Sequence, residues 1–231
     1  LKSYLFEITG YVLKQPDEFN QGKYLIDYIL DKAWEKWTWK WTVIDAIQRW
    51  VAVPSISQAV FARAISAKKD IRTNLSKKYD FKLSTIDMPL EDFILKMENA
   101  LYIAMLSNYA QGYSLIQLAA VEQWRNIDLW EISRIWEWWC IIRAEILHFI
   151  HNAFQSTQDK SINLLEIPEI NTWITQNIKD YADIVSMMNK VGVASHSLGA
   201  WLSYIFSMTN EVVSANLIQW LRDYFGAHTY L

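Results

Sequence analysis

Apolar residues recur at three- and four-residue steps along most of this chain, the spacing that places side chains on one face of an α-helix. The clearest runs are Tyr4, Leu5, Ile8 and Val12; Val60, Ala64, Ala67 and Ile71; and Phe93, Met97, Leu101, Ala104 and Met105. No segment alternates apolar and polar residues for long enough to indicate a sheet. The pattern therefore predicts an all-α fold of about eight to ten helices.

Two of these helices are predicted to be long, from Leu90 to Glu122 and from Leu129 to Phe154. Helix starts are expected after Pro54 and Pro89, because proline fits the first turn of a helix. The predicted breaks are the polar stretches 15–22, 80–89 and 156–161.

Two uncharged runs, Ala100 to Val121 and Val191 to Asn210, are about as long as the roughly 20 residues that a membrane span needs. Both contain several amide or hydroxyl side chains, and neither has an excess of basic residues at one end. We favour buried helices of a large helical domain over membrane spans.

Composition narrows the class of protein. The chain has 231 residues, 52% of them hydrophobic and 20% charged, which indicates one large or two small globular domains. A net charge of −3 provides no general attraction for nucleic acid. The single Cys140 excludes an internal disulfide and fits a reducing compartment. The first residues lack both an initiator Met and a signal-peptide pattern, so we expect a fragment that begins within a longer protein.

Few residues suggest chemistry when they are considered alone. Lys36 to Thr42 is predicted to be a loop that leads into a helix, where lysines, a hydroxyl and a helix N-terminus could bind an anion, although such loops are more often only solvated. Arg63 on an apolar face suggests a structural salt bridge, and Arg222 and His228 a helix cap and a surface group. The pair His148 and His151 has no carboxylate or cysteine partner in sequence, so we predict no metal site.

The stretch from Asp31 to Thr42 has four tryptophans between lysines. With Trp34, Trp37 and Trp39 read as glycine, it closely resembles the Gly-x-Lys-Gly-Thr-Gly-Lys-Trp-Thr loop of 6-phosphogluconate dehydrogenases. Further segments resemble the C-terminal domain of that family in the same order, namely Gln58-Ala-Val-Phe-Ala-Arg-Ala-Ile-Ser66, Ser107-Asn-Tyr-Ala-Gln-Gly-Tyr113, Ile135-Trp-Glu-Trp-Trp-Cys-Ile-Ile-Arg143 and Leu217-Ile-Gln-Trp-Leu-Arg-Asp-Tyr-Phe-Gly-Ala-His-Thr-Tyr230.

Tryptophan stands repeatedly where that family typically has glycine, whereas Trp41 and Trp136 match family tryptophans. The eight substituted positions are Trp34, Trp37, Trp39, Trp50, Trp124, Trp130, Trp138 and Trp139. We hypothesise that the source reads UGA as glycine. We then expect several of the eight to be exposed or to crowd the anion site, while Trp41 and Trp136 stay packed.

The resemblance implies roles for individual residues. Lys40 and Thr42 of the Lys-Trp-Thr motif would contact the phosphate of bound 6-phosphogluconate, as would Arg63. Arg222 and His228 would reach into the site of the other subunit of a homodimer. Several cations around a dianionic phosphate are the expected arrangement for its recognition.

The resemblance also implies an activity. The family converts 6-phosphogluconate with NADP to ribulose 5-phosphate and carbon dioxide, in the cytoplasm. Residues 1–231 would be its C-terminal substrate-binding and dimerisation domain, incomplete at both ends. The dinucleotide-binding domain that holds NADP, and the catalytic lysine and glutamate, would lie outside this chain, so the fragment alone should be inactive. The alternative is a non-catalytic protein, either a degenerate relative or a tryptophan-rich helical module that binds membrane surfaces or partner helices.

Overall fold

A computed structural model describes residues 1–33, 37–157, 159 and 162–230 of the chain. The described part consists of helices and loops and contains two isolated bridges but no strand, so the all-α prediction is confirmed. Its α-helices are α1 (Tyr4–Lys14), α2 (Trp37–Gln48), α3 (Pro54–Ser66), α4 (Lys69–Ser76), α5 (Leu90–Glu122), α6 (Leu129–Trp139), α7 (Glu145–Ser156), α8 (Pro168–Lys190), α9 (His196–Thr209) and α10 (Ala215–Gly226), with short 3-10 helices at Leu25–Tyr28 and Leu164–Glu166.

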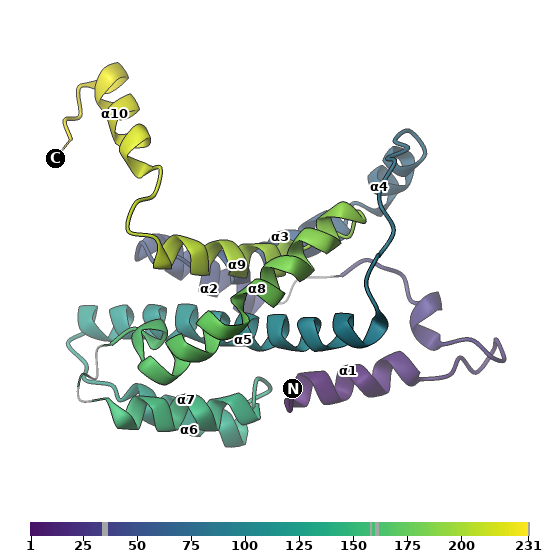
Figure 1. Cartoon of the computed structure of the whole chain (residues 1–231), viewed down its shortest axis with the longest axis horizontal. Helices are drawn as coiled ribbons and strands as arrows, with labels where there is room; N and C mark the ends of the chain where they lie inside the picture. Colours follow the sequence, from purple (N-terminus) through teal and green to yellow (C-terminus); the bar gives the residue numbers. More distant parts are fainter. Residues whose placement is uncertain (34–36, 158, 160–161, 231) are drawn as a thin grey trace.

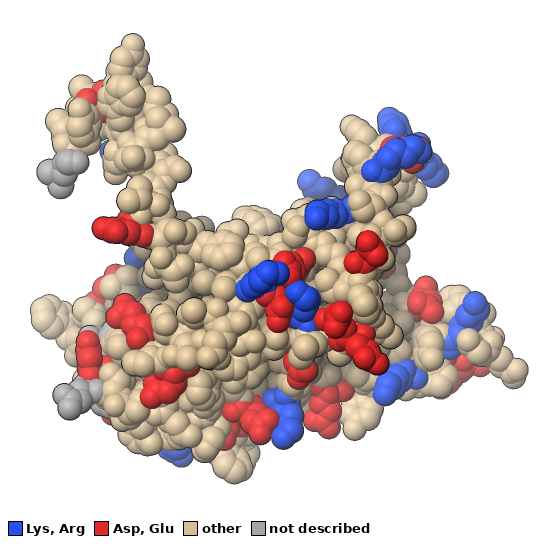
Figure 2. All heavy atoms as spheres, in the orientation of Figure 1, with Lys and Arg blue, Asp and Glu red and all other residues tan. Residues whose placement is uncertain are grey.

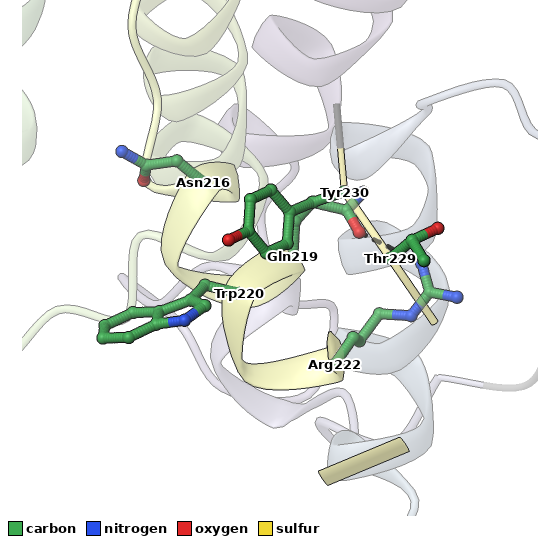
Figure 3. A pocket seen from close by; sticks show the side chains of 6 residues that line it. All are labelled: Asn216, Gln219, Trp220, Arg222, Thr229 and Tyr230. Carbon is green, nitrogen blue, oxygen red and sulfur yellow. Dashed lines mark hydrogen bonds between the residues drawn. The ribbon is translucent and has the colours of Figure 1, made fainter. Parts of the chain in front are cut away.

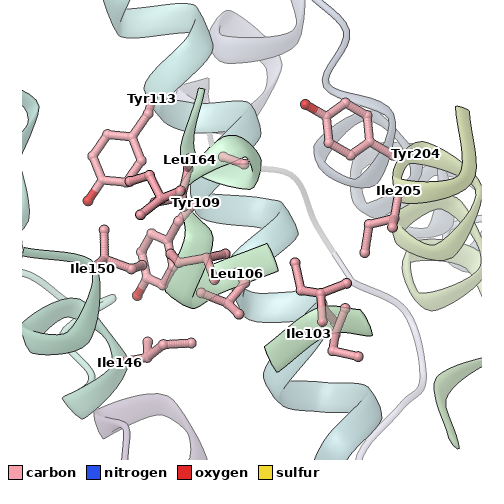
Figure 4. Packing of buried hydrophobic residues seen from close by; sticks show 14 of the residues in the cluster. Ile103, Leu106, Tyr109, Tyr113, Ile146, Ile150, Leu164, Tyr204 and Ile205 are labelled. Carbon is pink, nitrogen blue, oxygen red and sulfur yellow. The ribbon is translucent and has the colours of Figure 1, made fainter. Parts of the chain in front are cut away.

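The 33-residue helix α5 is the central element, and its predicted bounds are confirmed. It follows Pro89, and Glu91 and Asp92 lie in its first turn, where negative charge favours the helix dipole. Its middle carries no charged residue and is largely buried, as expected for an interior helix. Helices α7, α8 and α9 cover it, and Figure 4 shows side chains from α5, α7 and α9 meeting in the main core.

The prediction of a second long helix is wrong, because residues 129–154 form two helices, α6 and α7, separated by Cys140–Ala144. The break is caused by pairing with the start of the chain. Tyr4 N–H donates to the Arg143 carbonyl at 3.1 Å, and Glu145 N–H donates to the Lys2 carbonyl at 2.9 Å. This pairing holds Ala144 in an extended conformation that a helix cannot contain. The other long helix is instead α8, with 23 residues.

Helices α2 and α3 pack on the far end of α5 through a separate small cluster. Its buried members are Val43, Ala46, Val53, Ile56 and Leu115. Helix α3 also packs along α9. The two helices that were expected to bind an anion are therefore attached to the body through this small cluster and, for α3, also through α9.

Helix α2 begins at Trp37 and not at Thr42, so the prediction of a loop over residues 36–42 is wrong for its described part. Thr42 lies in the second turn, where its hydroxyl donates to the Thr38 carbonyl at 3.0 Å. Tryptophan, threonine and lysine have helix propensities sufficient to extend the helix backward, which three closely spaced glycines would oppose. Lys36 and Trp34 lie outside the described residues.

Helices α4 and α10 project from the body on opposite sides (Figure 1). Helix α10 makes no extended contact with another described helix, and its large apolar side chains are exposed. These are Leu217, Ile218, Trp220, Leu221, Tyr224 and Phe225. In Figure 2 this arm is mostly uncharged, whereas lysine and arginine gather on the arm formed by α4. None of the described helices is both long and apolar enough to cross a membrane.

Candidate functional site

The predicted anion-binding residues of α2 and α3 lie on neighbouring helices. The Arg63 guanidinium carbon is 6.0 Å from the centre of the Trp39 ring, and one guanidinium nitrogen donates to the Ala59 carbonyl at 3.3 Å. Thr42 lies one turn after Trp39, and both residues line a cavity that is described below. The structural salt bridge suggested for Arg63 is not found, because no described carboxylate pairs with it. Arg63 and Thr42 are therefore brought to one region with Trp39 between them.

Lys40 also belongs to α2 and is exposed to solvent. It forms no ion pair within the described parts of the chain, so its ammonium group can meet an anion at little cost. An unpaired lysine and a partly buried arginine on adjacent helices give this region a local positive charge, although the whole chain is weakly acidic.

The cavity beside Thr42 has a volume of about 440 Å³ and lies among α1, α2, α5 and the α6–α7 connection. Trp39 forms part of its wall. Arg143 lies at the same cavity and stacks over the Tyr4 ring, with its guanidinium carbon 3.7 Å from the ring centre. Sequence reasoning assigned no role to Arg143. A tryptophan in this wall occupies space that a glycine would leave open beside Arg63 and Thr42.

Arg222 and His228 lie apart from these residues, on and just after α10. Figure 3 shows Arg222 beside Thr229 and Tyr230, and the Arg222 guanidinium donates to the Gln219 side chain at 3.1 Å. The His228 ring packs close to Gly226, where an added Cβ would lie 2.6 Å from a ring carbon. Because α10 stands away from α2 and α3, one chain alone does not bring all five predicted residues together.

Two of the eight tryptophans occupy backbone positions that favour glycine. Trp50 and Trp124 have φ angles of 58° and 56°, in the left-handed region. Each follows the end of a helix, and the next residue donates back five positions, from Val51 to the Ala46 carbonyl and from Arg125 to the Ala120 carbonyl.

This hydrogen-bond pattern is the Schellman motif, whose left-handed residue is usually glycine. Helix α8 ends in the same way, and there the left-handed residue is Gly192, with φ 76°. The motifs after α2 and α5 are neighbours, because Arg49 and Glu122 at these two helix ends form an ion pair. Trp50 and Trp124 are 93% and 97% exposed, so neither gains packing in exchange for its backbone conformation.

The remaining tryptophans differ in their exposure to solvent. Trp138 and Trp139 are exposed, as expected for substituted glycines, whereas Trp130 packs against the main core. Trp136 is packed against the core as predicted, but Trp41 is 57% exposed, so the expectation that it stays packed is wrong for the single chain. Of Trp34, and of the Trp37 side chain, the structure describes nothing.

Other candidate chemistry is sparse. Among the described residues, no group of three or more histidine, cysteine, aspartate or glutamate side chains is arranged to hold a metal ion. Cys140 is half-buried in the break after α6 and not inside a helix as predicted. The most concentrated ion-pair network joins α5 to α8, where Lys96 contacts both Asp180 and Asp183. Hydrogen bonds to the Asp183 carboxylate, from Lys179 first and then Lys96, lower its pKa.

Comparison with known proteins gives a consistent assignment. All 231 residues match the family described as 6-phosphogluconate dehydrogenase, C-terminal domain. The chain is 37% identical over 230 residues to the decarboxylating 6-phosphogluconate dehydrogenase of Synechocystis sp., covering 100% of this chain and 47% of that protein. The corresponding protein of Lactococcus lactis is 38% identical over 231 residues, covering 100% of this chain and 48% of that protein.

A solved structure of Plasmodium falciparum 6-phosphogluconate dehydrogenase is also similar, with a TM-score of 0.92 and 35% identity. That enzyme is described in its apo form, with its cofactor NADP+ and with its substrate 6-phosphogluconate. The match covers 99% of this chain and 49% of that one, so the chain spans about half the length of its relatives. Sequence, fold and length of match agree, and the chain belongs to the 6-phosphogluconate dehydrogenase family, whose C-terminal domain it represents.

Proposed function

We propose that this chain is the substrate-binding and dimerisation part of an NADP-dependent, decarboxylating 6-phosphogluconate dehydrogenase. The observation that supports this most directly is that Arg63 on α3 and Lys40 and Thr42 on α2 lie on neighbouring helices, at the positions where the family motif has its phosphate contacts. The reaction would yield ribulose 5-phosphate and carbon dioxide. A cytoplasmic setting is part of the proposal, in keeping with the lone Cys140.

The chemistry of the three residues fits a sugar phosphate. The guanidinium of Arg63 offers forked donors to two phosphate oxygens, while Lys40 supplies a mobile positive charge. Neither residue forms an ion pair with a carboxylate in the described structure. The Thr42 hydroxyl, now bonded to the Thr38 carbonyl, could turn toward an incoming anion.

NADP and the proton-transferring groups are assigned to a part of the protein outside these residues. No Gly-x-Gly-x-x-Gly motif occurs in the sequence, and the described fold has no parallel sheet on which to place one. In this division of labour the chain holds and orients the substrate, and the dinucleotide-binding domain accepts the hydride. NADP reduction would therefore need both parts.

We also propose a homodimer in which α10 of each chain docks on the other. An isolated helix of about twelve residues is marginal in water, and the apolar side chains of α10 are exposed, with no extended contact to another described helix. Helix α2 offers a matching exposed apolar face through Trp41, Ile44 and Ile47. Docking of the arm would bring Arg222 and His228 toward the partner's substrate site.

The phosphate role is tested by steady-state kinetics on the full-length protein. Replacing Arg63 by Ala should weaken 6-phosphogluconate binding by roughly 1.5 to 3 kcal/mol, the range for a hydrogen bond to a charged group. The Michaelis constant should then rise more than tenfold, since 1.4 kcal/mol corresponds to a factor of ten. Arg134→Ala is the matched control, because Arg134 is exposed on α6 and pairs only with Glu131. Equal Michaelis constants for the two variants would show that Arg63 does not contact the substrate.

The exchange of arms is tested by mixing two impaired subunits, Arg63→Ala and Arg222→Ala. If each site combines α3 of one chain with α10 of the other, a mixed dimer has one doubly altered site and one intact site. Random exchange should therefore restore about a quarter of the wild-type sites. A mixture no more active than its parents would show that α10 does not complete the partner's site.

The alternative, a non-catalytic helical module that binds membrane surfaces, is favoured by one observation, the exposure of Trp50, Trp124, Trp138 and Trp139. It predicts that the chain sediments with lipid vesicles and loses this binding when the four residues become serine. The enzyme proposal predicts no such sedimentation.

A further inference from the structure

A buried polar joint connects α3, α5 and α9. At its centre is Gln111 of α5, which is fully buried. Its side-chain oxygen accepts from the Ser55 hydroxyl at 2.7 Å and from the Ser55 backbone N–H at 3.3 Å. Its side-chain nitrogen donates to the Ser107 hydroxyl at 3.4 Å. From α9, the Ser197 hydroxyl donates to the Ser55 carbonyl at 3.3 Å.

The joint replaces a missing helix cap. The residue before α3 is Val53, whose side chain cannot accept a hydrogen bond, and the first residue, Pro54, has no N–H. The next free N–H group, that of Ser55, needs an acceptor because it is buried. Gln111 supplies this acceptor from a different helix. The start of α3 is thereby fixed to α5, where the Ser55 hydroxyl also lies 3.1 Å from the Asn108 side-chain oxygen.

This fixed point matters for Arg63, which lies eight residues further along α3, about 12 Å at 1.5 Å per residue. The Arg63 side chain is bonded to the Ala59 carbonyl of its own helix, so its position follows that of α3. The apolar cluster beneath α2 and α3 has only five buried members and is non-directional. Hydrogen bonds at the joint are directional, and they fix the start of α3 against α5 and α9.

We propose that Gln111 is a positioning residue for substrate binding, and that its contact with Ser55 sets the distance between Arg63 on α3 and Lys40 on α2. The inference depends on the proposed phosphate role of Arg63. Gln111 itself does not touch the substrate in this arrangement.

The test is Gln111→Met in the full-length enzyme, a change that keeps side-chain length and removes both hydrogen-bonding atoms. The Michaelis constant for 6-phosphogluconate should rise about tenfold, the scale at which small misplacement of a binding group is felt. The Michaelis constant for NADP and the turnover number should stay within about twofold, because NADP and the reacting groups are held elsewhere. The milder Ser55→Ala, which removes one of the two bonds to Gln111, should shift the same constant in the same direction, and it serves if Gln111→Met does not fold.

The matched control is Ser133→Ala. Ser133 is also fully buried, and it forms a 2.7 Å hydrogen bond with Tyr113 between α5 and α6, away from α3. This variant should lose stability without a change in the Michaelis constant. If Gln111→Met and Ser55→Ala behave like Ser133→Ala while Arg63→Ala is impaired, the positioning role is wrong. If Arg63→Ala is unimpaired, the proposed phosphate role itself is wrong.

Discussion

Replacing Trp50 and Trp124 by glycine should make this protein more stable, although each change deletes the largest side chain. Both residues hold left-handed backbone conformations, which cost a residue with a Cβ roughly 1–2 kcal/mol. Relief of this strain is partly offset, because glycine loses more backbone entropy on folding, which costs about 0.5–1 kcal/mol. Since both side chains are more than nine-tenths exposed, no packing energy is lost. The net gain is therefore about 1 kcal/mol per site.

The assay is urea unfolding of the single and double variants, with thermal unfolding alongside. The double variant should gain about 2 kcal/mol, which corresponds to a melting temperature roughly 4–8 °C higher for a chain of this size. Trp139→Gly is the matched control, because Trp139 is 93% exposed but ends α6 without a left-handed backbone. It should lose a few tenths of a kcal/mol through lower helix propensity. Trp136→Gly should lose at least about 3 kcal/mol, because it empties a packed aromatic site.

If Trp50→Gly and Trp124→Gly stabilise the protein no more than Trp139→Gly, the strain explanation is refuted. If they do stabilise it, the gain supports our proposal that UGA is read as glycine at these positions. The mass of the protein purified from its source gives an independent answer, because tryptophan and glycine differ greatly in mass. Tryptophan at all eight positions in that protein would exclude the glycine reading.

Three further outcomes are expected. Trp39→Gly should tighten the binding of 6-phosphogluconate in titration calorimetry, because the indole forms part of the cavity wall at the proposed phosphate site. Asp183→Asn should flatten the loss of stability in acid. The hydrogen bond from Lys179 is the main cause of the lowered pKa of Asp183 in the folded protein. The ionised carboxylate therefore stabilises the fold fully above the unfolded-state pKa near 3.9, and this stabilisation disappears as the pH falls through the lower folded-state pKa. Urea unfolding across that pH range measures the effect. Gly226→Ala should raise the Michaelis constant for 6-phosphogluconate with little change in stability, because the new Cβ would displace the exposed ring of His228.

The elements that sequence predicted correctly are those whose limits are encoded locally. Helix α5 follows a proline, has two acidic residues in its first turn and contains a long uncharged run, and all three features can be read within the segment itself. The break at Cys140–Ala144 depends on hydrogen bonds with residues 2–4, more than a hundred positions away. Nothing in the spacing of apolar residues within 129–154 indicates this pairing. The helical periodicity runs across the break and therefore predicted one continuous helix.

The candidate site was predictable in its residue types and not in its arrangement. Motif similarity identified Lys40 and Arg63, and the structure places them on adjacent helices. Gln111 was missed, because a glutamine in an uncharged run shows no role until the helix end opposite it is known. The left-handed conformation of Trp50 was also hidden, since only the folded chain shows that the helix ends in a Schellman motif.

The homodimer that we propose through α10 would make stability a function of protein concentration. Helix α10 has no extended contact with another described helix, so its folding would be linked to association by mass action. Each tenfold dilution makes association less favourable by about 1.4 kcal/mol. Amide hydrogens of α10 should therefore exchange faster as the protein is diluted, while those in the middle of α5 keep their protection. Chains that have dissociated would leave the apolar side chains of Leu221 and Phe225 exposed to solvent.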